Sequence, residues 1–66
     1  MSDFTEAETA ADALARVLIW RGIPLTDVGD AMLAEALVLL IASRGRHEVS
    51  DDLRYVANCL EAPHGD

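Results

Sequence analysis

Apolar residues recur every three or four positions along most of the chain, which is the period of an α-helix with one buried face. The first such stripe consists of Phe4, Ala7, Ala11, Leu14 and Leu18. Thr5 and Glu8 have the T-x-x-E spacing of a capping box, so we expect a helix over residues 5–21. Further apolar residues widen this stripe beyond what a single neighbouring helix would cover.

The next segment is apolar on all sides of a helix rather than along one face. One face carries Val28, Met32, Leu33, Ala36, Leu39 and Leu40, and the side roughly opposite carries Ala34, Val38 and Ile41. Gly22 and Pro24 form a stop signal before it, and Pro24 suits a first helical turn, which predicts a second helix over residues 25–43. Because a helix that is apolar all round must be buried all round, two short neighbours would not shelter it.

A narrower amphipathic stripe lies near the C-terminus. Its members are Leu53, Val56, Ala57 and Leu60, with the spacing i, i+3, i+4, i+7. Ser50 is a good N-cap, and Asp51 and Asp52 are favoured near the positive end of a helix dipole. These signals predict a third helix over residues 51–62, followed by a frayed tail over residues 63–66.

The breaks between the segments are short. Gly45 is expected to take the left-handed position that ends the second helix. No alternation typical of strands competes with the helical pattern. We therefore predict an all-α fold with one domain over residues 1–66, in which helices 1 and 2 run antiparallel and helix 3 packs across them.

Composition limits how stable such a domain would be alone. The chain has 66 residues, 52% of them apolar but only 5% aromatic, and its single cysteine excludes an internal disulfide. In chains this short, the hydrophobic gain and the conformational entropy lost on folding nearly cancel. We therefore expect a homodimer with two-fold symmetry, in which helices 1 and 2 of both chains build a shared bundle.

The apolar residues in excess of one core are the predicted interface. They are Val17 and Trp20 in the first helix and Ala34, Val38 and Ile41 in the second. Trp20 is the expected anchor, because tryptophan is enriched among residues that carry binding energy. This pattern predicts a small protein–protein interaction module, such as an adaptor, antagonist or regulatory subunit, whose partner is a second copy or another protein.

The charge balance separates the alternatives. Twelve acidic residues against five basic ones give a net charge of −7, which argues against sequence-independent binding to nucleic acid or to anionic lipid. An acidic inhibitor that mimics nucleic acid is the second hypothesis. A helix-turn-helix DNA-binding dimer is the third, and it is disfavoured because the third predicted helix begins with Asp51 and Asp52, where a recognition helix needs DNA-contacting residues.

Residues that could carry chemistry form no recognised motif. Cys59, His47 and His64 lack the spacing of a metal site or of a nucleophile and its base, so we expect no enzyme, metal or cofactor. The N-terminus does not resemble a secretory signal, and the nearly apolar run over residues 31–42 is shorter than the ~20 residues of a membrane span. The lone cysteine fits a reducing compartment, which predicts a cytoplasmic protein.

Overall fold

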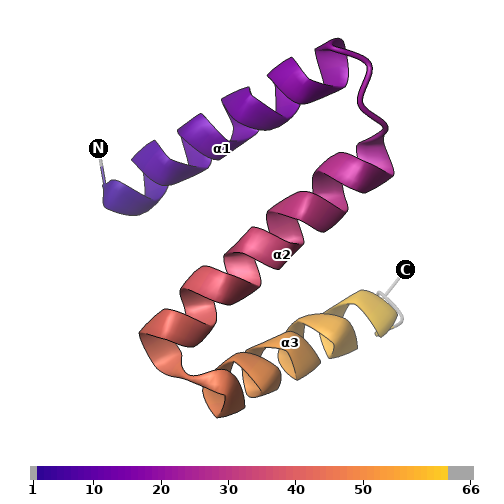
Figure 1. The fold of residues 1–66 in the computed structure, drawn as a ribbon. Helices are drawn as coiled ribbons and strands as arrows, with labels where there is room; N and C mark the ends of the chain where they lie inside the picture. The colour runs from indigo at the N-terminus through magenta and orange to yellow at the C-terminus, as the bar shows by residue number, and fades with distance from the viewer. Residues whose placement is uncertain (1, 63–66) are drawn as a thin grey trace. The chain divides into compact units, whose positions relative to one another are not determined.

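The computed structural model describes residues 2–62, and within them every regular element is an α-helix (Figure 1). The helices are α1 (Asp3–Trp20), α2 (Leu25–Arg44) and α3 (Arg46–Glu61). The prediction of an all-α chain with three helices is therefore confirmed. The chain divides into two compact units, Met1–Leu33 and Ala34–Asp66, so α2 contributes its first half to one unit and its second half to the other.

α1 begins two residues before the predicted start, because Ser2 rather than Thr5 is its N-cap. The Ser2 Oγ accepts a hydrogen bond of 3.1 Å from the backbone N–H of Thr5, and the two hydroxyl oxygens lie 2.9 Å apart. Thr5 is thus inside the first turn, and the predicted capping box is wrong. Asp3 and Glu6 lie in the same turn, where negative charge is favoured by the helix dipole.

α1 ends just before Gly22, as the sequence predicted, and the end is a Schellman motif. Gly22 has a φ of 93°, its N–H donates to the Ile19 carbonyl at 2.9 Å, and the N–H of Ile23 donates to the Leu18 carbonyl at 3.1 Å. These two bonds satisfy carbonyls that a helix end would otherwise leave unpaired. The chain then turns back, and α1 and the first half of α2 run in opposite directions (Figure 1).

Burial in the first unit is concentrated beside this turn. Val28 of α2 is buried, and Leu18 of α1 and Met32 of α2 are half-buried. Phe4 and Leu14, from the same predicted stripe as Leu18, are exposed. The N-terminal part of that stripe is rich in alanine, which buries little apolar area and so adds little to the attraction between helices.

A single residue, Gly45, separates α2 from α3. It has a positive φ of 86°, but its ψ of 160° is extended, and its carbonyl accepts the first backbone hydrogen bond of α3, from Val49 at 3.2 Å. α3 therefore begins five residues before the predicted start, and Ser50 lies inside the helix instead of capping it. The additional turn brings Val49, which is only 2% exposed, onto the face that also carries Leu53.

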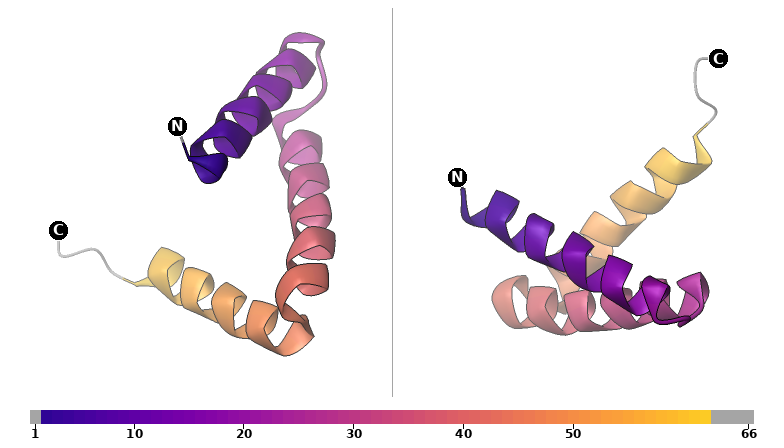
Figure 2. Two further views of the ribbon diagram at one scale, coloured as in Figure 1. Left: turned by 90° about the vertical axis from the view of Figure 1, so that its left-hand side faces the viewer. Right: turned by 90° about the horizontal axis from the view of Figure 1, so that it is seen from above.

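The apolar stripe of α3 becomes progressively more exposed away from Gly45. Exposure rises from 2% at Val49 to 40% at Leu53, 52% at Val56 and 77% at Leu60. Figure 2 shows the reason, since α3 diverges from the second half of α2 after the turn. Within this unit, only the beginning of the amphipathic stripe is therefore buried.

The burial pattern of α2 also differs from the prediction. Leu37 and Leu40 are half-buried, whereas Leu33 and Leu39, which we expected on the core face, are exposed.

Within residues 2–62, no helix is both long enough and apolar enough to cross a membrane.

Candidate interaction surfaces

The five predicted interface residues are all exposed and lie on two helix faces. Val17 and Trp20 are three residues apart in α1, and Trp20 is 89% exposed. Ala34, Val38 and Ile41 follow one another at i, i+4 and i+7 in α2, and Val38 is 61% exposed. We call these groups the α1 patch and the α2 patch. They belong to different units of the chain.

A third apolar surface is the α3 stripe of Leu53, Val56 and Leu60, which the sequence pattern indicates to be amphipathic but which is not among the predicted interface residues. The signal that could have revealed it is the spacing of Val49, Leu53, Val56 and Leu60, which is 4, 3 and 4 residues. This is the heptad spacing with which two helices interlock along a seam. The sequence does not indicate that only the first member, Val49, is covered by the chain's own second unit.

An open groove of about 400 Å³ runs beside the α3 stripe within the second unit. Its lining residues are Leu40 and Arg44 of α2 and Asp52, Leu53, Tyr55 and Val56 of α3. Most of this lining is apolar, and the charged pair supplies the polar part. The groove and the stripe therefore form one continuous apolar surface.

The charged pair in the groove is an ion pair between Arg44 and Asp52. Arg44 Nη1 lies 3.0 Å from Asp52 Oδ2, and both side chains are about half exposed. That Oδ2 atom is shielded from solvent and accepts no directed hydrogen bond from the described residues. The contact is thus held by charge alone, and it leaves the groove electrically neutral where α2 meets α3.

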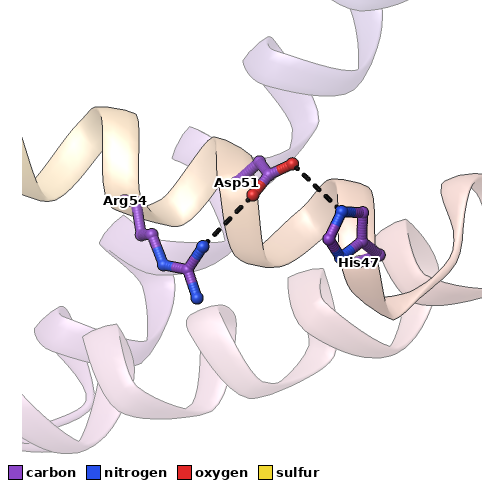
Figure 3. Close-up of polar contacts among 3 residues, drawn as sticks. All are labelled: His47, Asp51 and Arg54. Atoms are coloured by element: carbon purple, nitrogen blue, oxygen red, sulfur yellow. Dashed lines mark hydrogen bonds and ion pairs between the residues drawn. The ribbon is translucent and has the colours of Figure 1, made fainter.

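Three polar side chains, His47, Asp51 and Arg54, lie in a row along one face of α3 (Figure 3). Asp51 Oδ2 lies 3.7 Å from His47 Nε2, and Arg54 Nη1 donates to Asp51 Oδ1 at 3.3 Å. The row exists because α3 begins at Arg46, which places these residues at i, i+4 and i+7 of one helix. It lies on the side of α3 opposite the apolar stripe.

This geometry also bears on the helix-turn-helix hypothesis. The expectation that the third helix opens with two aspartates is wrong, because its first turn contains Arg46, His47 and Glu48. Nevertheless, only Gly45 separates the two helices, whereas the DNA-binding motif has a turn of about three or four residues. Arg54 and Arg44 are each paired with an aspartate of α3.

The polar face of α1 carries one well-formed ion pair. Arg16 Nε donates to Asp12 Oδ2 at 2.8 Å. This hydrogen bond, together with the negative charge of the carboxylate, raises the pKa of Arg16. The guanidinium therefore stays charged on the solvent side of the helix, where both side chains are exposed.

The residues considered for chemistry remain dispersed. Cys59 is a free and exposed thiol, and His64 lies outside the described residues. Over residues 2–62, no group of three or more His, Cys, Asp or Glu side chains is arranged to hold a metal ion.

No family model, no curated protein and no solved structure matches this sequence. Function must therefore be inferred from the surfaces of the chain. The most informative are the α1 patch, the α2 patch and the α3 stripe.

Proposed function

We propose that this protein is a non-enzymatic interaction module that binds another protein chain through exposed apolar helix faces, and that its first partner is a second copy of itself. One observation carries the proposal. Among the described residues, only Val28 and Val49 are buried apolar side chains, whereas large apolar side chains are exposed on all three helices.

The size of the two units strengthens this argument. Each spans 33 residues, Met1–Leu33 and Ala34–Asp66, and folded chains below about 40 residues usually depend on disulfides, metals or association. One fully buried side chain contributes only about 1.5–3 kcal/mol. That is a small part of the conformational entropy lost when 33 residues are ordered. Covering the exposed faces with another chain would supply the missing burial.

Salt dependence distinguishes this proposal from binding through the acidic surface. Contacts made by apolar faces such as the α2 patch do not depend on long-range charge, so added salt should leave them nearly unchanged. Binding of the −7 chain to a basic partner through its carboxylates should weaken as ionic strength rises, because exposed charges are screened.

The direct test is the molar mass in solution, measured by size-exclusion chromatography with light scattering over a range of micromolar concentrations. We expect a mass above the 7.1 kDa of one chain, unchanged between low and high salt. A folded monomer at all concentrations, with no binding of a dye that reports exposed apolar surface, would refute the proposal.

A substitution then tests the α2 patch itself. Val38→Asp puts a charge on an exposed position, so it should not unfold an isolated chain, but it should lower the mass or the melting temperature of an assembly that covers Val38. Asn58→Asp adds the same charge to the outer face of α3 and serves as the matched control. If the two variants behave alike, the α2 patch contributes nothing to association.

A further inference from the structure

We infer that two copies of this chain pair through their α3 stripes, with the adjoining groove receiving side chains of the second copy. The inference rests on the proposed function and identifies its partner and its contact. It places the seam on Leu53, Val56 and Leu60, none of which belongs to the α1 or α2 patch.

The spacing of the stripe fits a helix–helix seam. Val49, Leu53, Val56 and Leu60 repeat at 4, 3 and 4 residues, and two helices with this repeat interlock by inserting each side chain between those of the other. Val49 is already buried within its own unit, while exposure rises along the three that follow. Within the second unit, the first position is therefore buried and the other three are exposed.

Residues beside the stripe favour a close approach between helices. Ser50 and Ala57 flank it on one side, and Cys59 and Asp52, which is paired with Arg44, flank it on the other; Ser50, Ala57 and Cys59 are small and uncharged. Two helices with small flanking residues can pack at short interaxial distances. By the helical register, the larger polar side chains His47, Asp51 and Arg54 lie on the opposite face, where they would not obstruct the seam.

Charge indicates that the occupant is a second copy. In a two-fold contact the same patch lies on both sides, so any net charge at its rim meets a like charge. Each chain carries −7, yet the two charged residues that line the groove, Arg44 and Asp52, are paired with each other. An apolar surface whose lining charges balance internally is complementary to itself, whereas it offers little to a partner that binds through charge.

The groove extends the contact beyond α3. Leu40 of α2 adds an apolar wall next to Leu53 and Val56, and the volume of about 400 Å³ leaves room for large side chains. A helix lying along the stripe would cover this groove, as amphipathic helices do when they bind apolar grooves. Pairing therefore covers surface from both helices of the second unit.

The first experiment compares Leu60→Glu with Asn58→Glu by size-exclusion chromatography with light scattering. Both variants add one negative charge near the end of α3, but only Leu60 lies on the stripe. We expect the mass of Leu60→Glu to fall at a protein concentration at least tenfold higher than the concentration at which the mass of Asn58→Glu falls. Circular dichroism checks that both variants keep their helicity. If the wild type is an oligomer and Leu60→Glu leaves its mass unchanged, this inference is overturned while the proposed function stands. A wild type that is always monomeric overturns both.

The second experiment does not depend on disrupting the assembly. The exposed stripe runs from residue 53 to residue 60, so Val56 lies near its middle and close to its counterpart in either orientation of two helices. In a Cys59→Ser background, Val56→Cys should form a covalent dimer with oxidised glutathione at least tenfold faster than Asn58→Cys. Equal rates would show that the stripe is not the seam, even if Leu60→Glu had simply lost its fold.

Discussion

Two glycines of this chain should respond in opposite directions to the same substitution by alanine. Gly29 lies inside α2, and Gly45 joins α2 to α3. A Cβ added at either position would meet no atom within 4 Å apart from those of the adjoining backbone and neighbouring residues, so neither substitution creates a clash. The difference is in the backbone, because Gly45 has φ 86° and ψ 160°, a conformation nearly confined to glycine.

The expected magnitudes follow from this difference. In the interior of a helix, alanine is favoured over glycine by about 0.8–1.0 kcal/mol, so Gly29→Ala should raise the free energy of unfolding by about that amount. Forcing alanine into the conformation of Gly45 costs about 1–3 kcal/mol, partly offset by up to about 1 kcal/mol from a less flexible unfolded chain. The net loss should be about 1–2 kcal/mol. In a domain of this size, each kcal/mol shifts the melting temperature by about 4–8 °C.

The assay is urea denaturation followed by circular dichroism at 222 nm, with all variants at one protein concentration because association makes the midpoint concentration-dependent. Gly29→Ala should denature at higher urea than the wild type, and Gly45→Ala at lower urea. The reasoning would be refuted if Gly45→Ala were as stable as the wild type and more helical. That result would mean that α2 and α3 can join into one helix and that the break at Gly45 is not required.

Two further pairs of variants test the capping and the core. Ser2→Ala removes the N-cap of α1 and should lower the free energy of unfolding by about 0.5–2 kcal/mol. Ser50→Ala lies inside α3 and should be neutral or slightly stabilising. A loss of stability in Ser50→Ala, measured by urea denaturation, would contradict the observed start of α3. Val49→Ala removes two buried carbons, which costs about 1.6 kcal/mol of stability at about 0.8 kcal/mol per carbon. The higher helix propensity of alanine regains up to about 0.7 kcal/mol. Its net cost of about 1 kcal/mol should not vary with protein concentration, whereas the cost of Val56→Ala should rise with concentration as the second copy covers the stripe.

The helix breaks could be predicted from sequence because each depends on a local signal. Gly22 and Gly45 both have a positive φ, which other residues rarely adopt, and Pro24 directly precedes α2. Such signals depend on the backbone alone, so no knowledge of the tertiary contacts is needed to interpret them.

The start of α3 could not be predicted in the same way. Ser50, Asp51 and Asp52 resemble a helix N-terminus, but the helix begins at Arg46 with no side-chain cap. The earlier start buries Val49 and pairs Asp51 with residues one turn away on each side. These gains exist only once the turn has formed, and together they outweigh the capping preference of a serine.

The candidate surfaces show a second limit of the pattern. Amphipathic spacing identifies the face of a helix that favours an apolar environment, but it does not indicate which neighbour provides one. Val49 and Leu60 belong to one stripe with regular spacing, yet the first is buried and the last is 77% exposed. Within the second unit, the part of the stripe beyond Val49 is less buried and so contributes less to folding than Val49 does. In the pairing that we propose, a second chain covers Leu53, Val56 and Leu60, so the same repeat would serve folding at one end and association at the other.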